Sequence, residues 1–209
     1  MTRIFDISPV ISPRTAVFPQ DTAFAREVLL DIARGDNITL STVRTTLHLG
    51  SHADAPSHYG RGARTIDLQP LELYLGPARV VRAEGTRGRA VTVPDLAGKV
   101  PFGTERLVLA TGSFPDADRW DGDFASIDPA LVGWLATRGV RLLAVDTPSV
   151  DAATSKDLPA HRAFLEHDVA IIEGVRLDGV PEGTCELIAL PLRIEGGDGS
   201  PVRAVLRFP

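Results

Sequence analysis

The sequence predicts one layered α/β (α+β) domain that is dominated by β structure. Short β-branched and apolar runs recur along the 209 residues, separated by turns rich in glycine and proline. A capped helix stands between two of these runs, and strand–helix–strand alternation mixed with hairpins is typical of such layered folds. A chain of this length buries roughly 70% of its unfolded surface in one core. No repeat or low-complexity linker divides it, so we expect a single domain over residues 1–209.

The first half of the chain predicts strands joined by turns. Residues 4–7 form a short first strand, which leads into a loop interrupted by prolines. Residues 25–33 and 38–48 predict two strands of a hairpin, since the connection between them is rich in turn formers. Residues 78–83 and 106–111 predict two further strands.

The middle of the chain carries the clearest helix signal. Asp128 suits the N-cap, Pro129 suits the first helical position, and Gly139 follows the last apolar residue. Residues 140–145 then read as a buried strand. This succession supports a parallel connection through a helix.

The last third predicts a second helix and three strands. Pro159 indicates a first helical turn, and the helix ends near Glu166. Residues 169–172 and 184–188 predict two strands, the second of which would bury Cys185. We interpret residues 196–199 as a hairpin turn between two final strands rather than a ligand loop.

Composition excludes several classes of partner. The net charge is −5 and the 22 basic residues are scattered, which argues against a nucleic-acid or anionic-membrane surface. A single cysteine, Cys185, excludes an intrachain disulfide and fits a reducing compartment. Neither a signal-like start nor an uncharged apolar run long enough to span a bilayer is apparent. We therefore expect a cytoplasmic protein.

One stretch concentrates metal-ligand chemistry. Eleven residues contain His48, His52, Asp54 and His58, which offer the nitrogen and oxygen ligands that zinc and similar divalent ions prefer. Gly50 disfavours a helix here, so we expect the cluster at a strand end leading into an irregular loop. The alternative is a polar loop whose histidines form local hydrogen bonds, but the density of ligand types favours a metal site.

This stretch also resembles a known signature. It reads His48-x-Gly50-Ser51-His52-x-Asp54-x-Pro56-x-His58, which is similar to the H-x-G-[T/S/A]-H-x-D-x-P-x-H pattern of the cyclase-like metal hydrolases. The best-known members of that family are the bacterial kynurenine formamidases. The similarity extends to residues 5–8, 17–21, 158–161 and 171–174. The resemblance implies the cyclase-like swivelling β/β/α fold.

The resemblance further implies a binuclear metal site. Its ligands would be His48, His52, Asp54, His161 and Glu173. His48, His52 and Asp54 would hold one divalent ion, and Asp54, His161 and Glu173 a second, with zinc expected and manganese possible. A metal-bound hydroxide would attack an amide carbonyl while His58, the histidine left over, carries the proton.

The implied substrate is N-formyl-L-kynurenine, which would give L-kynurenine and formate in tryptophan degradation. Phe18 stands where the bacterial formamidases usually have tryptophan, and it would form an aromatic wall of the pocket without the indole N–H. Simple packing of its loop is the alternative. Arg61 and Arg64 belong to a basic stretch that could meet a substrate carboxylate, although a solvated loop is favoured. Family precedent implies a homodimer.

Two other hypotheses stay open. One is a related cyclase-family hydrolase that acts on another amide, a lactam or a cyclic imide with the same ligands. The other is a metal-binding module without activity, which would not need the spare proton carrier His58. No G-x-S-x-G elbow supports a serine nucleophile, and His167 suits a helix C-terminus better than a ligand position.

Overall fold

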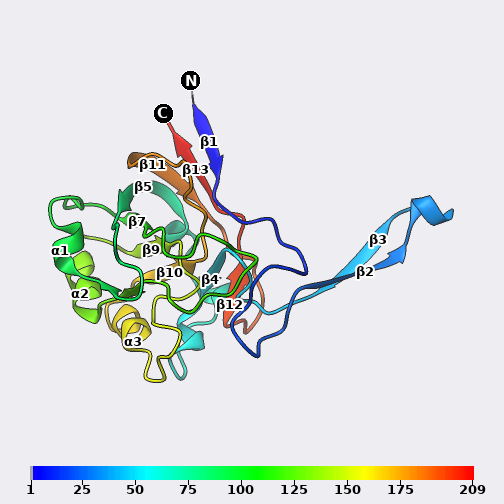
Figure 1. Ribbon diagram of the computed structural model, residues 1–209, viewed down its shortest axis with the longest axis horizontal. Coiled ribbons are helices and arrows are strands. Elements are labelled where there is room, and N and C mark those ends of the chain that lie inside the picture. The colour runs from blue at the N-terminus through cyan, green and yellow to red at the C-terminus, as the bar shows by residue number, and fades with distance from the viewer. Residues whose placement is uncertain (1) are drawn as a thin grey trace.

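A curved mixed sheet of nine strands forms the centre of the computed structural model, which describes residues 2–209 (Figure 1). Its strands, in spatial order, are β1 (Arg3–Asp6), β13 (Val205–Phe208), β11 (Gly183–Ile188), β5 (Leu75–Arg82), β7 (Arg106–Ala110), β9 (Leu142–Val145), β10 (Ala170–Glu173), β4 (His52–Asp54) and β12 (Gly199–Pro201). The neighbours β5, β7, β9 and β10 are parallel, and the strands outside them pair antiparallel. The expectation of a β-rich mixed fold is confirmed.

Helices cover one face of this sheet. They are α1 (Val93–Leu96), α2 (Pro129–Thr137) and α3 (Pro159–Glu166), and all three lie on the same side of the strands in Figure 1. Side chains alternate along each strand, so Leu107 and Leu109 of β7 pack toward the helices while Val108 packs toward the opposite face. That opposite face shares one core with residues of β11, β13 and β4, which belong to distant parts of the sheet. The sheet therefore curls around its second core.

The two predicted helices begin and end close to the expected residues. The Asp128 side chain accepts a hydrogen bond from the Ala130 amide at 2.8 Å and caps α2. Pro159 starts α3, which ends at Glu166. Six predicted strands are also present, with boundaries shifted by one to three residues. They are the strands expected at residues 4–7, 78–83, 106–111, 140–145, 169–172 and 184–188.

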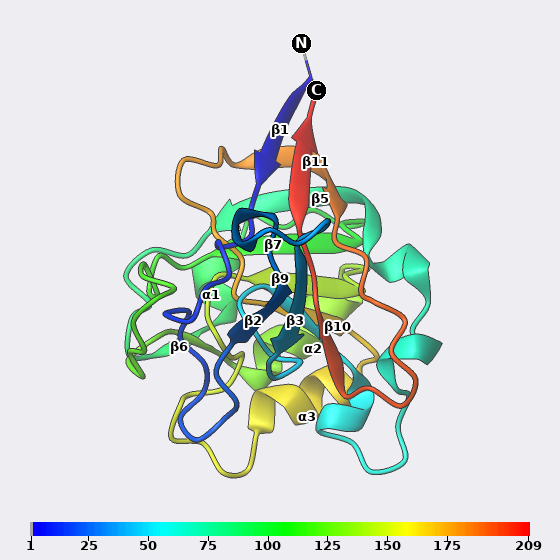
Figure 2. The same cartoon turned by 90° about the vertical axis from the view of Figure 1, so that its right-hand side faces the viewer.

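A two-stranded hairpin projects away from the body of the molecule (Figure 1), and Figure 2 views it from its projecting side. It consists of β2 (Ala25–Leu30) and β3 (Leu40–Arg44), which pair with each other and with no other strand of the described chain. The predicted strands were longer. The first ends early because a 3-10 turn (Ile32–Arg34) follows it and closes on Gly35, whose φ of 95° suits glycine.

Short elements complete the described chain. A parallel pair is formed by β6 (Ala90–Val91) and β8 (Ser126–Ile127). Further 3-10 turns span Pro56–His58, Ile66–Leu68 and Leu71–Leu73. No helix between residues 2 and 209 is both long and apolar enough to cross a membrane.

The prediction of a final hairpin is wrong. Residues 196–199 do not join two paired strands, because β12 pairs with β4 while β13 pairs with β1 and β11 at the other end of the sheet. The Asp198 carbonyl accepts a hydrogen bond from the Ala55 amide at 2.9 Å, which extends the pairing with β4. This long-range pairing fixes the segment beside the histidine-rich stretch.

Candidate metal and catalytic centre

The three residues of β4 lie inside the sheet and bring two polar side chains to one face. His52 pairs in register with Glu173 of β10, and Asp54 pairs with Gly199 of β12. Side chains alternate, so His52 and Asp54 share a face while Ala53 enters the opposite core. The prediction of an irregular loop is therefore wrong for His52 and Asp54. Their segment is a strand because partners on both sides complete its hydrogen bonds.

Four side chains converge on this face. The imidazole Nε2 of His52 lies 3.4 Å from Asp54 Oδ1 and 3.3 Å from Glu173 Oε2. His161, on the first turn of α3, places its Nε2 3.4 Å from Asp54 Oδ2 and 3.7 Å from Glu173 Oε1. Each of the four residues is at most 3% exposed. We call His52, Asp54, His161 and Glu173 the buried cluster.

Hydrogen bonds outside the buried cluster orient its two histidines. His52 Nδ1 lies 3.0 Å from the Gly50 carbonyl, and His161 Nδ1 lies 2.7 Å from the Asp151 carboxylate. Since both partners are acceptors, each Nδ1 donates, and each Nε2 faces the carboxylates of the cluster, where it can carry a proton or, once deprotonated, bind a metal ion. Metal-bound histidines are held in this way.

Asp151 is a site residue that the sequence did not indicate. Besides His161 Nδ1, its carboxylate accepts the backbone N–H groups of Ala160 and His161 at 2.9 and 3.0 Å. It therefore caps the start of α3, although it lies further from the helix in sequence than the residues of a local capping motif. One carboxylate thus fixes both the helix and the ring of His161.

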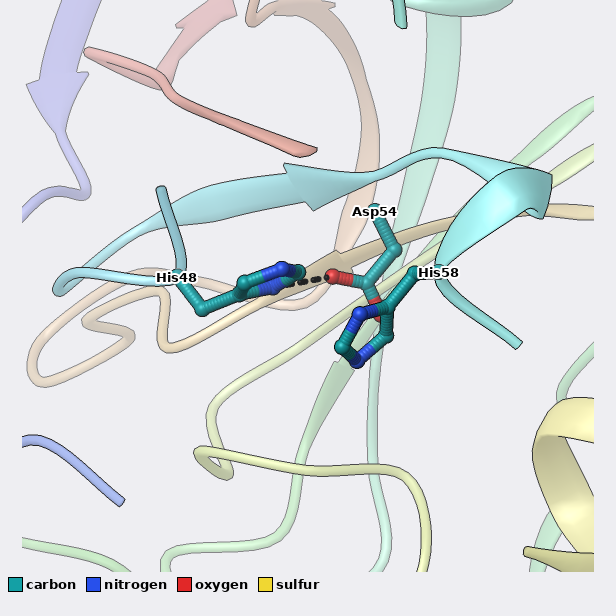
Figure 3. A group of neighbouring side chains, drawn as sticks. All are labelled: His48, Asp54 and His58. Carbon is teal, nitrogen blue, oxygen red and sulfur yellow. Dashed lines mark hydrogen bonds and ion pairs between the residues drawn. The ribbon is translucent and has the colours of Figure 1, made fainter. Parts of the chain in front are cut away.

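His48 and His58 form an outer layer beside Asp54 (Figure 3). His48 Nδ1 lies 3.0 Å from Asp54 Oδ1, and the His48 and His58 rings are tilted face to face with centroids 4.1 Å apart. Ligand atoms of these three residues lie within 4.8 Å of one another, as do those of His52, Asp54 and Glu173. Asp54 is thus shared by both groups.

Asp198 joins this outer layer from the segment that was predicted to be a plain turn. Its Oδ2 lies 3.1 Å from His48 Nε2 and 3.5 Å from His58 Nδ1. The glycines around Asp198 favoured a turn, and only the pairing of β12 with β4 brings the carboxylate to the histidines. Sequence reasoning missed it for that reason.

The centre favours added positive charge. Burial lowers the pKa of His48, but Asp54 and Asp198 together raise it to about 9. Burial opposes protonation of His161 as well, yet Asp151, Asp54 and Glu173 raise its pKa to about 10. Burial raises the pKa of Asp54, but the imidazoles of His161 and His48 beside it hold it well below its usual range. When no metal ion is bound, protons on these histidines supply the positive charge that a bound metal ion would supply.

His58 differs from the other three histidines of the centre. Burial lowers its pKa, and the attraction of Asp54 does not compensate because His48 and His161 oppose a further positive charge. A neutral imidazole has one nitrogen that accepts a proton and one that donates. His58 thus has the properties of a proton carrier rather than of a fixed cation.

The residues present fit a divalent metal ion. Asp54 Oδ2 is buried and has no hydrogen-bond partner among residues 2–209, which would be costly without a cation. Two imidazole Nε2 atoms face two carboxylates, a mixed nitrogen and oxygen set suited to zinc and related ions. The buried cluster is therefore a divalent-metal site in composition and arrangement.

A cavity of about 490 Å³ opens above the centre. Its floor includes His52, His161 and Glu173, and aromatic side chains form part of its wall. Phe18 lines the cavity and packs edge-on against Trp120, with ring centroids 5.0 Å apart. Phe18 is thus both a lining residue of the cavity and a packed residue of its loop, and its contact with substrate stays a prediction. Trp120 was missed because its aspartate-rich loop carries no local pattern that points to the cavity.

Other candidates lie outside the cavity. Neither Arg61 nor Arg64 lines it, and Arg64 pairs instead with Asp168. Cys185 is buried in β11, where burial raises the pKa of its thiol to about 11, as expected for a structural cysteine. His167 follows α3 and lies beside Gly133 of α2, away from the buried cluster.

Comparisons with known proteins agree with this geometry. The family model described as "Putative cyclase" matches residues 5–152. The kynurenine formamidase of Maricaulis maris is 44% identical over 207 residues, which cover 99% of each chain.

Solved structures share the fold. A potential metal-dependent hydrolase with cyclase activity superimposes with a TM-score of 0.86 at 24% identity, over 99% of this chain and 98% of its own. Isatin hydrolase A from Ralstonia solanacearum superimposes with a TM-score of 0.82 at 26% identity, over 100% of this chain and 92% of its own. With the family model covering well over half of the residues, the chain belongs to the cyclase family.

Proposed function

We propose that this chain is a kynurenine formamidase, an amide hydrolase that converts N-formyl-L-kynurenine to L-kynurenine and formate in tryptophan degradation. One observation carries the proposal: the buried cluster forms the floor of an aromatic-walled cavity that also contains His58. The 44% identity to the kynurenine formamidase of Maricaulis maris over the whole chain supports the same reaction.

Five side chains would hold two divalent ions, with zinc the first expectation and manganese the second. His48, His52 and Asp54 would bind one ion, and Asp54 would share the second with His161 and Glu173. Such ions, when bound, polarise the scissile carbonyl and acidify water. Asp54 lies beside His48, His52 and His161, at 3.0, 3.4 and 3.4 Å, which supports its role as the shared ligand.

The protein groups position the substrate and move its protons. Water adds to the formyl carbon, the carbon–nitrogen bond breaks, and the aryl nitrogen gains a proton. His58 is the catalytic group for both transfers, because its lowered pKa keeps the imidazole able to accept the water proton and then donate it. Phe18 and Trp120 offer faces on which the aryl ring of the substrate can stack.

Assay of two substrates tests this proposal. Purified wild-type protein should release formate from N-formyl-L-kynurenine, measured together with the absorbance of the amine product. Isatin serves as the comparison, since the similarity to isatin hydrolase A favours a lactam as the second candidate substrate. Turnover of isatin alone would establish that second candidate. Turnover of neither would leave the centre as a metal-binding module.

We also propose a homodimer in which the projecting hairpin contacts a second copy. Five large apolar residues of the hairpin are exposed: Leu29, Ile32, Ile38, Leu40 and Val43. Such a patch is the usual mark of an interface. Sedimentation should give a dimer at micromolar concentration, and Leu40→Asp with Val43→Asp should give a monomer, whereas the nearby Ser41→Asp should not. A monomeric wild-type protein would contradict the dimer.

Two further proposals concern organisation and location. Both hydrophobic cores pack against the same nine-stranded sheet, which supports a single domain over residues 1–209. One cooperative unfolding transition is expected, and two separate transitions would contradict it. A cytoplasmic location is supported by the lone reduced Cys185, and cell fractionation tests it.

A further inference from the structure

We propose that Arg176 binds the carboxylate of the substrate's amino-acid side chain and thereby selects N-formyl-L-kynurenine over simpler aryl formamides. This inference rests on the proposed function, and it adds a specificity-determining residue to it. The sequence offered Arg61 and Arg64 for this task, but neither lines the cavity. Among the lysines and arginines of residues 2–209, Arg176 alone does.

Arg176 is fixed to the same segment as the buried cluster. It follows Glu173, the last residue of β10, by three positions. The segment turns at Gly174, where φ is 69° and an added Cβ would lie 2.2 Å from the Gly50 carbonyl oxygen. The Gly174 amide donates to the Thr147 carbonyl at 2.8 Å, and the Arg176 amide to the Ile7 carbonyl at 2.7 Å. The backbone of Arg176 is therefore held in place relative to the centre.

The guanidinium of Arg176 has free donors. Its side chain is 27% exposed and makes one hydrogen bond to a side chain of the described residues, to Asp178 at 2.6 Å. Asp178 is itself 73% exposed, so solvent screens this pair and it holds the guanidinium only weakly. A guanidinium has five N–H donors in a planar fork that matches a carboxylate. A second carboxylate can therefore bind beside Asp178.

The rest of the cavity is unsuited to a substrate carboxylate. The acidic residues that line it are Asp21, Asp146 and Glu173. Asp146 accepts hydrogen bonds from the Thr111 amide and hydroxyl and from the Gly112 amide, so it stays a fixed part of the wall. The ions proposed for the floor would face the reacting formamide, so a carboxylate at the other end of the substrate needs a cation of its own. Arg176 supplies that cation.

Two substrates that differ only at the amino-acid end test the inference. N-formyl-L-kynurenine has the carboxylate, and 2′-formamidoacetophenone keeps the aryl formamide and the ketone without it. Arg176→Ala should lower kcat/KM for N-formyl-L-kynurenine by about 10- to 100-fold, chiefly through KM, because a charged hydrogen-bonded pair is lost. The same variant should change kcat/KM for 2′-formamidoacetophenone by less than about threefold.

Two further variants make the result specific. Arg176→Lys keeps the charge without the fork and should lose less than Arg176→Ala. Arg61→Ala removes an equal charge outside the cavity and should leave both substrates unchanged. Thermal unfolding and metal content of each variant are measured first, so that only folded, metallated proteins are compared.

Three outcomes would overturn the inference. Equal losses on both substrates would show a structural role for Arg176, and no loss on either would show that another group binds the carboxylate. A wild-type protein that hydrolyses neither formamide would contradict the proposed function itself and the role of Arg176 with it. The wild-type control therefore separates the two kinds of failure.

Discussion

The floor and the wall of the cavity are built in different ways. The floor consists of side chains on β4, β10 and α3 that are at most 3% exposed, and each imidazole is held by a second hydrogen bond. The wall includes Phe18, which is 45% exposed and lies in a loop before the projecting hairpin. The reaction type therefore depends on the packed sheet, whereas the choice of substrate depends on exposed loops that can vary without disturbing it.

The largest effect is expected at Asp54, whose carboxylate belongs to both groups of candidate ligands. Asp54→Asn removes a negative charge from both groups of candidate ligands, so bound metal should fall to near zero and kcat/KM by about 10³-fold or more. Elemental analysis and formate release measure the two quantities. Asp157→Asn, an exposed aspartate in the loop before α3, should retain both. An Asp54→Asn protein with full metal and full turnover would contradict the assignment of the floor.

The next largest effect separates proton transfer from metal binding. His58→Gln should keep the wild-type metal content and fold, because His58 is not among the five proposed ligands, while kcat falls by about 10²- to 10⁴-fold. Metal analysis with steady-state kinetics measures both. Loss of metal in step with activity would make His58 a ligand instead of a proton carrier.

A smaller loss of metal affinity is expected when Asp151, which holds the ring of His161 from outside the buried cluster, is changed. Asp151→Asn can donate to His161 Nδ1, which would turn the ring proton toward Asp54 and Glu173. Metal affinity should fall by about 10- to 100-fold while the fold persists. Competition with a chelating dye measures the affinity. Unchanged affinity would mean that Asp151 serves only to cap α3.

Substitutions in the cavity wall should change KM rather than kcat. Phe18→Ala removes a stacking face and should raise KM for N-formyl-L-kynurenine by about 3- to 10-fold, with kcat within about twofold. Phe18→Trp should preserve or lower KM, since it keeps the face and adds an N–H. Metal content serves as the control. A kcat that collapses in Phe18→Ala would break the division between floor and wall.

The smallest effect concerns the turn that carries Phe18. The Asp21 amide donates to the Phe18 carbonyl at 2.9 Å, and Gln20 has a φ of 78°, a conformation that glycine adopts without strain. Gln20→Gly should stabilise the fold by about 0.5 kcal/mol, since relief of strain exceeds the added freedom of the unfolded chain. Calorimetry should show a rise in Tm of about 1 to 2 °C. A lowered Tm would mean that the Gln20 side chain stabilises the loop.

The parts of the molecule that sequence could predict are those with local signals. Asp128 and Pro159 mark the starts of α2 and α3, and both helices formed at the expected residues. The spacing of His48, His52, Asp54 and His58 likewise indicated one centre within eleven residues.

Residues whose position depends on tertiary pairing could not be predicted from the sequence. β4 has no apolar alternation, and it becomes a strand only between β10 and β12. Asp198 reaches His48 through that same pairing, and Asp151 reaches His161 across a loop. His161 and Glu173 were placed at the centre by resemblance, because nothing in their local sequence links them to His52. Arg176 had no signal, since only the turn at Gly174 brings it to the cavity.

Metal content measured together with turnover tests the central claim most directly. The protein as purified should contain close to two divalent ions per chain and release formate from N-formyl-L-kynurenine. Chelation should abolish that release, and added zinc or manganese should restore it. Full turnover by protein shown to be free of metal would contradict the account.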